Sequence, residues 1–164
     1  MKPEFVDVYD AHVWDVYGYL AYRVDSREEA EDLTQGTFER ALRAWGRFDA
    51  GKAAPRTWLL SIAHNLLIDH YRAARARPVT VAEHLTTERD HGVQEGPEHD
   101  LGLSPELATA LEALAQRDRE VVALRFGGQL TGPEIAGLLG LSLANVQQIL
   151  SRSLRRLRSE LEAD

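Results

Sequence analysis

Apolar side chains recur at three- and four-residue steps along the first part of the chain, a spacing typical of amphipathic helices. A first helix is expected from about residue 4 to residue 24. Its apolar positions are Phe5, Tyr9, Val13, Val16, Tyr17, Leu20 and Val24. Ser26 and Glu29 have the spacing of a capping box, which predicts a second helix from there to about Trp45. The inner face of this helix is expected to carry Ala30, Leu33, Thr37 or Phe38, Ala41, Leu42 and Trp45.

A third helix is expected to begin at Pro55, because proline is favoured at the first helical position, and to run to about Ala76. Its buried stripe is predicted to contain Trp58, Leu59, Ile62, Ala63, Leu66 and Tyr71. The opposite face then shows the polar side chains Arg56, Ser61, His64, Asn65, Asp69, Arg72 and Arg75. Three helices of this kind form a block that needs no strands.

Further helices are predicted after residue 103. Ser104 followed by Pro105 indicates the start of a helix that runs to about Ala115, with a stripe of Leu107, Leu111 and Leu114. Asp118 is expected to cap the next helix, which ends at Gly127-Gly128 and carries Val121, Val122, Leu124 and Phe126. These two helices are expected to buttress the pair that follows.

Residues 130–158 predict a helix-turn-helix. Thr131 and Glu134 have the spacing of a capping box. Gly140 falls where the first helix needs a left-handed cap residue, and Ser142 is a natural N-cap for the second helix. The second helix of such a motif enters the major groove of DNA. Its inward side chains are expected to be Val146, Leu150, Leu154 and Leu157, and those left to face the groove are Ser142, Ala144, Asn145, Gln147, Gln148, Ser151 and Arg152.

Charge divides the chain into two helical blocks and an acidic connection. Of the net charge of −7, residues 78–103 contribute −5 through one arginine against six acidic residues. Residues 1–77 and 104–164 are each nearly neutral, at −1. We therefore expect an all-α fold of two small helical domains joined by a flexible linker over residues 78–103, with one helical turn near residues 81–86. Local basic faces, rather than the total charge, decide whether such domains can contact phosphates.

The sequence contains no cysteine, which excludes disulfides and thiolate metal sites and fits a reducing cytosol. No apolar run approaches the ~20 residues of a membrane span. The N-terminal residues are acidic and lack the basic-then-apolar layout of a signal peptide. These features predict a cytoplasmic protein without membrane insertion.

Two stretches carry a family resemblance that covers nearly the whole chain. Residues 28–72, EEAEDLTQGTFERALRAWGRFDAGKAAPRTWLLSIAHNLLIDHYR, resemble the second conserved region of bacterial sigma factors. Residues 114–158, which begin LAQRDREVVALRFGG, resemble their fourth region. Two such regions joined by a short linker resemble the small extracytoplasmic-function (ECF) group of the sigma-70 family. The resemblance implies a transcription initiation factor that binds core RNA polymerase and directs it to specific promoters.

The Asp-Leu-Thr-Gln segment of the second helix matches positions that, in the family, dock on the largest polymerase subunit. By this resemblance the polymerase-binding residues are Asp32, Gln35 and Phe38. Gly36 stands where an acidic residue is usual, and glycine costs a helix about 1 kcal/mol relative to alanine. A solvated helix face is the alternative interpretation of these polar side chains.

The third helix and the loop before it resemble the elements that read and open the −10 promoter element. Holding unpaired bases requires aromatic stacking or an enclosing pocket, and contact with phosphates requires basic side chains. The residues implied are Phe48, Lys52, Arg56, Ser61, His64, Asn65, Asp69, Arg72 and Arg75. Ser61 and His64 replace residues that are often arginine in the family, which weakens this basic face. Trp58 is expected to pack in the core.

The helix-turn-helix resembles the part of the family that recognises the −35 promoter element. The residues implied are Thr131, Ser142, Ala144, Asn145, Gln147, Gln148, Ser151, Arg152 and Arg155. Asparagine and glutamine can bond adenine bidentately, so this face can read sequence. The family usually places Lys and Arg near Gln147 and Ile149, and we therefore expect this domain alone to bind DNA weakly and to depend on tethering.

The partners implied are core RNA polymerase, through its largest and second-largest subunits, promoter DNA, and an anti-sigma factor that covers both domains. No catalytic residue, cofactor or metal is expected. Asp69-His70 and His64 raise the alternative of a metal-dependent hydrolase, but the two histidines do not share a helix face and no further carboxylate motif follows. A second alternative is a helix-turn-helix regulator that does not join polymerase.

Overall fold

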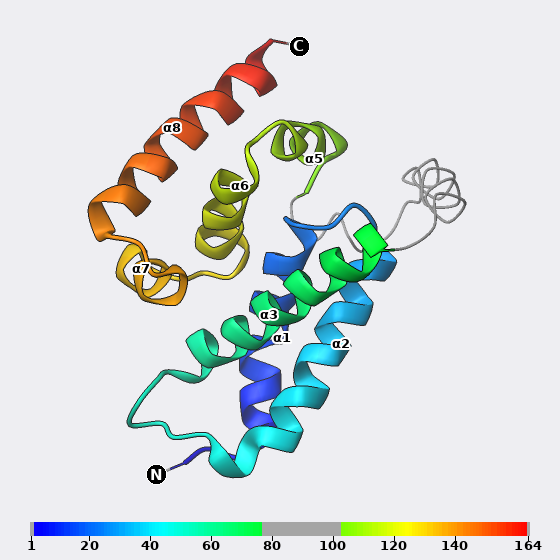
Figure 1. Ribbon diagram of the computed structural model, residues 1–164, viewed down its shortest axis with the longest axis vertical. Helices are drawn as coiled ribbons and strands as arrows, with labels where there is room; N and C mark the ends of the chain where they lie inside the picture. The colour runs from blue at the N-terminus through cyan, green and yellow to red at the C-terminus, as the bar shows by residue number, and fades with distance from the viewer. Residues whose placement is uncertain (1, 77–102, 164) are drawn as a thin grey trace.

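A computed structural model of the 164-residue chain describes residues 2–76 and 103–163, and every regular element in these two ranges is helical (Figure 1). The first range contains α1 (Phe5–Ala21), α2 (Arg27–Ala44), a 3₁₀ turn η1 (Trp45–Arg47) and α3 (Pro55–Ala76). The second range contains α5 (Pro105–Glu112), α6 (Gln116–Val122), a π-helical turn η3 (Ala123–Gly127), α7 (Gly132–Leu139) and α8 (Leu143–Glu162). The expected all-α fold is confirmed. The predicted linker over 78–103, with its helical turn, lies outside the described residues except for Leu103.

Local capping signals fix where most of these helices begin. The Ser26 hydroxyl accepts a hydrogen bond from the backbone N–H of Glu29 at 3.1 Å, and Ser104 accepts one from Leu107 at 3.1 Å. Each bond satisfies one of the amide groups that a helix start leaves without a partner inside the helix. The starts expected near Ser26 and Ser104 are therefore confirmed.

The helix-turn-helix has the predicted local geometry. Thr131 and Glu134 form both bonds of a capping box, with the Thr131 hydroxyl accepting at 3.3 Å and the Glu134 carboxylate accepting at 2.9 Å. Gly140 ends α7 with a φ of 69°, in the left-handed region that favours glycine. Ser142 then caps α8 by accepting from Asn145 at 3.1 Å.

Three details of the sequence interpretation are wrong. Asp118 does not cap α6, since the helix begins at Gln116 after extended backbone at Ala115. Leu42, expected inside, is 58% exposed, because the buried positions of α2 follow the face of Thr34, Phe38 and Ala41. Leu154 is likewise exposed. The buried positions of α8 are Val146, Ile149, Ser153 and Leu157, a sequence of three- and four-residue steps that passes Leu154 by.

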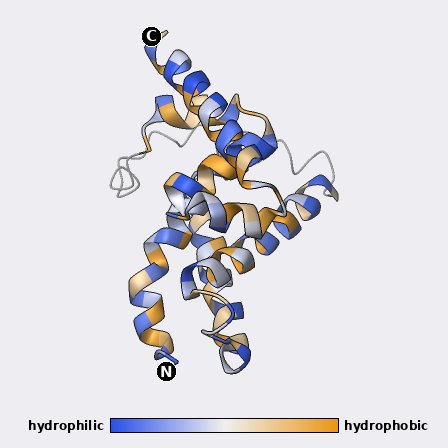
Figure 2. Ribbon diagram, turned by 90° about the vertical axis from the view of Figure 1, so that its left-hand side faces the viewer, coloured by the Kyte–Doolittle hydropathy of each residue, from blue (hydrophilic) through white to orange (hydrophobic). Residues whose placement is uncertain are grey.

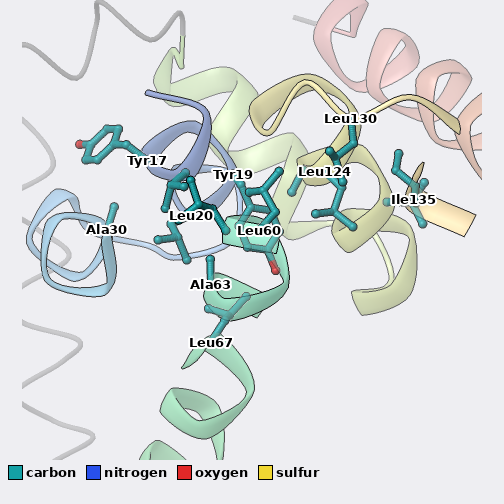
Figure 3. Close-up of a cluster of buried hydrophobic side chains, with 14 of the residues drawn as sticks. Tyr17, Tyr19, Leu20, Ala30, Leu60, Ala63, Leu67, Leu124, Leu130 and Ile135 are labelled. Atoms are coloured by element: carbon teal, nitrogen blue, oxygen red, sulfur yellow. The ribbon is translucent and has the colours of Figure 1, made fainter. Parts of the chain in front are cut away.

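The two helical blocks pack directly against each other. One cluster of buried apolar side chains runs from α1, α2 and α3 into η3, α7 and α8. Figure 3 shows Leu124, Leu130 and Ile135 of the second block beside Tyr19 and Leu60 of the first. Apolar stretches accordingly gather in the middle of the molecule, where the blocks meet (Figure 2). A smaller cluster joins α5, α6 and the distal part of α8 through Ala110, Leu111, Leu114, Val122 and Leu157.

Candidate DNA- and polymerase-binding surfaces

A groove of about 650 Å³ lies between α1 and α2. The spacing of the aromatic residues on α1 places most of them on one side of that helix, where they form one wall of the groove. The α2 wall adds mainly polar side chains. The lining residues are Phe5, Tyr9, Val13, Trp14 and Tyr17 from α1 and Arg27, Glu31, Thr34, Gln35, Phe38, Glu39 and Leu42 from α2. Trp14 is 65% exposed and Leu42, on the other wall, is 58% exposed. Contiguous exposed apolar surface of this kind is typical of interaction sites.

The residues predicted to bind polymerase lie in or beside this groove. Phe38 forms part of its floor and is 6% exposed, with ring centroids of Tyr9 and Phe5 at 4.8 Å and 6.4 Å in edge-to-face geometry. Gln35 stands at the rim, where its amide donates to the Glu39 carboxylate at 3.2 Å. Asp32 is exposed on α2 outside the lining. The structure thus brings Gln35 and Phe38 together with an aromatic wall that the sequence interpretation missed.

An aromatic stack holds the loop between η1 and α3. The Phe48 ring is stacked on Trp45, with centroids 4.9 Å apart and planes 7° apart, and it also meets Trp58 at 4.8 Å. Phe48 is only 7% exposed, so its ring faces the protein. Trp58 packs in the core cluster as expected. Lys52, farther along the loop, is exposed.

The predicted −10 residues on α3 differ in how far they are engaged within the protein. Asn65, Arg72 and Arg75 are exposed. The others have partners: Arg56 pairs with Asp15 at 2.9 Å, the Ser61 hydroxyl donates to the Trp58 carbonyl at 2.6 Å, His64 lies 3.5 Å from Glu120, and Asp69 pairs with Arg40 at 3.8 Å. Four of these seven side chains therefore contact other groups of the protein, although Asp69 stays exposed.

The predicted −35 residues of α8 form an exposed face. Ser142, Ala144, Gln147, Gln148, Ser151 and Arg155 are exposed, and Asn145 is half-buried. Arg152 is exposed too, but its guanidinium donates two bonds to Asp118, at 2.8 Å and 3.2 Å. Hydrogen bonding to this carboxylate raises the pKa of Arg152 above its ordinary value. Thr131 is exposed, and its side chain serves the capping box of α7.

Comparison with known proteins assigns both blocks. The Sigma-70 region 2 family matches residues 8–77, and the Sigma-70, region 4 family matches residues 110–159. The chain is 30% identical to the ECF RNA polymerase sigma factor SigX of Bacillus subtilis, covering 99% of this chain and 86% of that protein. The chain belongs to the ECF sigma factors of the sigma-70 family. It is also 35% identical to the ECF sigma factor BldN of Streptomyces coelicolor over 98% of its own length, but it spans 61% of that relative.

Solved structures agree on the fold of this sigma factor. The sigma factor RpoE of Bartonella quintana, in complex with the anti-sigma factor NepR, superposes with a TM-score of 0.72 at 18% identity and covers 98% of both chains. CnrH, in complex with the cytosolic domain of CnrY, superposes with a TM-score of 0.65 at 25% identity, covering 98% of this chain and 88% of that one. The likeness to RpoE supports the fold alone.

The side chains proposed for a hydrolase are engaged elsewhere in this sigma factor. His70 lies 3.1 Å from the Glu29 carboxylate, and Asp69 pairs with Arg40. In residues 2–76 and 103–163, no group of three His, Cys, Asp or Glu side chains is placed to hold a metal ion. Across the same two ranges, no helix has both the length and the apolar character needed to cross a membrane.

The sequence interpretation also missed a buried polar cluster between the two sigma regions. Tyr19 and Arg23 of the first region meet Glu120 of the second, and all three side chains are less than a tenth exposed. Burial, followed by the Glu120 carboxylate, raises the pKa of the Tyr19 hydroxyl well above its ordinary value. Tyr19 and Glu120 are 101 residues apart in the chain, so no local pattern links them.

Proposed function

We propose that this sigma factor binds core RNA polymerase and directs it to specific promoters. Residues 1–77 would bind polymerase and melt the −10 element, residues 104–164 would recognise the −35 element, and residues 78–103 would join the two domains. The observation that carries this proposal is the presence of both sigma regions, in this order, in one chain. The exposed face of α8 and the groove between α1 and α2 support it.

For the polymerase contact we propose Asp32, Gln35 and Phe38, with the aromatic wall of the α1–α2 groove as an additional docking surface. Glu31 and Glu39 line this groove, and Asp32 is exposed next to Glu31 in α2. Arg27 lines it too and pairs with Glu31 at 2.8 Å, so the groove keeps a small excess of acidic side chains. A partner segment with an apolar face and basic flanks would complement such a groove. The largest subunit of core polymerase would supply this segment, and the second-largest subunit would also contact the bound factor.

For promoter DNA we propose different kinds of contact at the two elements. At −10, residues Lys52, Arg72 and Arg75 would bind phosphates, and Asn65 and Asp69 would meet bases. At −35, the amides of Asn145, Gln147 and Gln148 would read base edges in the major groove, with Arg152 and Arg155 on phosphates. The stacked position of Phe48 means that it would have to leave Trp45 before it could stack on a base.

The remaining roles are proposed from family membership. The factor would act in the cytoplasm, where its polymerase is, and would contribute no catalytic residue of its own. Control by an anti-sigma factor is proposed on the same ground; RpoE of Bartonella quintana, which shares this fold, was solved with the anti-sigma factor NepR. A helix-turn-helix regulator that does not join polymerase is not favoured, because the region 2 match covers residues 8–77 in addition to the DNA-binding block.

Reconstituted transcription tests this function. Purified factor is mixed with core polymerase and genomic DNA fragments, and the transcripts are mapped at their 5′ ends. We expect initiation at a limited promoter set with a shared −35 and −10 sequence. Gln35→Ala combined with Trp14→Ala should weaken co-purification with core polymerase, whereas Arg117→Ala, on an exposed part of α6, should behave as the wild type. Operator binding without any initiation would contradict the proposal.

A further inference from the structure

A carboxylate of α1 reaches across to the first turn of α3. Asp15 lies in α1, and Arg56 is the second residue of α3. The Arg56 Nε group donates a hydrogen bond to Asp15 Oδ2 at 2.9 Å. Both residues belong to the first sigma region, so this contact does not depend on how the two regions pack.

Asp15 is held from a second side by its own helix. The His12 ring, three residues earlier in α1, places Nδ1 3.1 Å from the same carboxylate oxygen. The side chains of Asp15 and His12 are 16% and 17% exposed, whereas that of Arg56 is 39% exposed. Partly buried charge pairs are screened less by salt than pairs in open solvent. The carboxylate is therefore a fixed anchor, and the guanidinium is the partner that solvent and ligands can reach.

The pairing uses only one edge of the Arg56 guanidinium. Arginine carries its N–H donors in a planar fork, and Nε supplies just one of them. In residues 2–76 and 103–163, neither Nη1 nor Nη2 of Arg56 makes a hydrogen bond. Glu134 of α7 attracts the guanidinium electrostatically without bonding to it in these ranges. The remaining donors thus stay available in the geometry that binds a phosphate bidentately.

The place of Arg56 in the fold also favours an anion. It lies in the first turn of α3, a helix of 22 residues, and the N-terminal end of a helix carries a partial positive charge. Lys52 is exposed in the loop that leads into this turn. A phosphate of the −10 strand at the start of α3 would therefore meet the positive end of the helix together with Arg56.

An arginine that is already held loses less freedom when it binds DNA. A free arginine side chain gives up rotamer entropy on binding. Asp15 removes much of this freedom in advance, through the edge of Arg56 that a phosphate does not need. The same carboxylate also carries a negative charge, which repels DNA. Positioning and repulsion change the affinity in opposite directions, so an experiment can separate them.

We propose that Asp15 is a positioning residue for −10 DNA, whose carboxylate holds the Nε edge of Arg56 and leaves both Nη groups free to bind a phosphate of the melted strand. His12 keeps the carboxylate in place. Arg56 binds the phosphate while its bond to Asp15 persists. This inference rests on the proposed contact of α3 with the −10 element, and it adds Arg56 to the phosphate contacts proposed above.

Holoenzyme that contains the full-length factor tests this role. The probe is a fluorescein-labelled promoter fork with a single-stranded −10 segment, taken from a promoter that the wild type uses in reconstituted transcription. Arg56→Ala should weaken binding about tenfold, because hydrogen bonds between charged groups are lost. It should also lower the slope of log affinity against log salt by about 0.7, the value for a phosphate contact on a single strand. Asp15→Ala should weaken binding about fivefold, because Arg56 must then be ordered when DNA binds. The double variant should bind no more weakly than Arg56→Ala.

Two further variants separate positioning from charge. Asp10→Ala removes the same charge from an exposed position of α1 and should change the affinity little. Asp15→Asn removes the charge but keeps an acceptor oxygen, so it should restore part of the binding that Asp15→Ala loses. This variant also decides the result if Asp15→Ala does not fold.

The hydrogen bond itself can be measured in the free chain by nuclear magnetic resonance. Arg56→Lys assigns the Nε–H signal of Arg56, because that signal disappears in the variant. We expect this proton to exchange with water more slowly in the wild type than in Asp15→Ala, since a hydrogen bond protects it.

Equal exchange in the wild type and Asp15→Ala would overturn the inference. So would normal binding of the fork by Arg56→Ala, equal or tighter binding by Asp15→Ala, additive losses in the double variant, or an Asp15→Asn variant that binds no better than Asp15→Ala. A wild type that initiates at no promoter would instead refute the proposed function, and the role of Asp15 in DNA contact with it. The two failures are distinguishable, because one concerns the variants and the other the wild type.

Discussion

The two helices proposed to face DNA, α3 and α8, differ in how much of their polar surface is already engaged within the protein. On α3, Arg56, Ser61, His64 and Asp69 all contact other groups of the protein. On the described part of α8, Arg152 is the predicted contact residue with an ion-pair partner, Asp118. The face of α8 proposed for −35 recognition is thus largely free of internal contacts, whereas the face of α3 proposed for the −10 element would have to exchange internal contacts, except that between Arg56 and Asp15, for DNA.

The largest expected effect comes from removing the Glu120 carboxylate, which pairs with Arg23 and lies beside His64 of α3. Glu120→Ala would leave Arg23 buried without its partner, which typically costs about 3–5 kcal/mol. We expect the midpoint of urea unfolding to fall accordingly, with the unfolding signal divided into two transitions. Arg27→Ala, which removes an exposed pair with Glu31, serves as the control and should change the midpoint little. An unchanged unfolding curve for Glu120→Ala would mean that the buried pair with Arg23 does not stabilise the packing of the two regions.

A second prediction concerns the preformed face of α8. Replacing Gln148 with Ala removes an amide that can bond a base edge, a contact of about 1–3 kcal/mol. The expected loss should appear in holoenzyme binding to its selected promoter and should diminish when the −35 sequence is scrambled. Arg117→Ala provides the control. If the loss were the same on both duplexes, Gln148 would not be reading sequence.

A third prediction concerns Gly36, a glycine inside α2 that lowers the stability of this helix. A Cβ at this position would meet Leu66 Cδ1 at 3.5 Å, an ordinary contact. Gly36→Ala should therefore stabilise α2 by about 1 kcal/mol, measured by urea unfolding. Affinity for core polymerase is measured on the same variant, since Gly36 adjoins Gln35. A destabilised variant would show that the helix is constrained here by something other than the space around Cβ.

The smallest expected effect is on the salt dependence of DNA binding. Asp118→Asn would free the Arg152 guanidinium from a carboxylate that now competes with phosphate. One additional phosphate contact would steepen the slope of log affinity against log salt by about 0.9. Titration with potassium chloride on promoter duplex measures the slope. An identical slope for Asp118→Asn and wild type would mean that Arg152 does not reach DNA.

The sequence predicted those parts of the fold that depend on neighbouring residues. Ser26, Ser104, Thr131 and Ser142 mark helix starts because each hydroxyl bonds an amide three residues later. The spacing of apolar residues predicted buried positions less reliably, because a shift of one residue moves a side chain to another face of the helix. On α8 the buried hydroxyl of Ser153 replaces the expected Leu154, which a purely apolar criterion cannot anticipate.

The candidate surfaces could be predicted only where they depend on neighbouring residues along one helix. The turn at Gly140 fixes where α8 begins, and helix geometry then predicts which of its residues are exposed. The engagement of α3 could not be predicted, since His64 is held by Glu120 from a distant part of the chain. The α1–α2 groove was also missed, because Tyr9 fits an amphipathic stripe equally well whether it is covered or open, and Trp14 lies outside the predicted stripe.

The shared core of the two regions has a consequence for the integrity of the chain. A protease that cuts the chain between residues 77 and 103 would yield two fragments whose complementary surfaces include Leu60 on one and Leu124 on the other. The fragments should remain together as a one-to-one noncovalent complex with the mass of the intact chain in solution. An intact backbone would then not be needed to hold the two regions together in the free protein. It would be needed only when both regions bind one promoter at the same time.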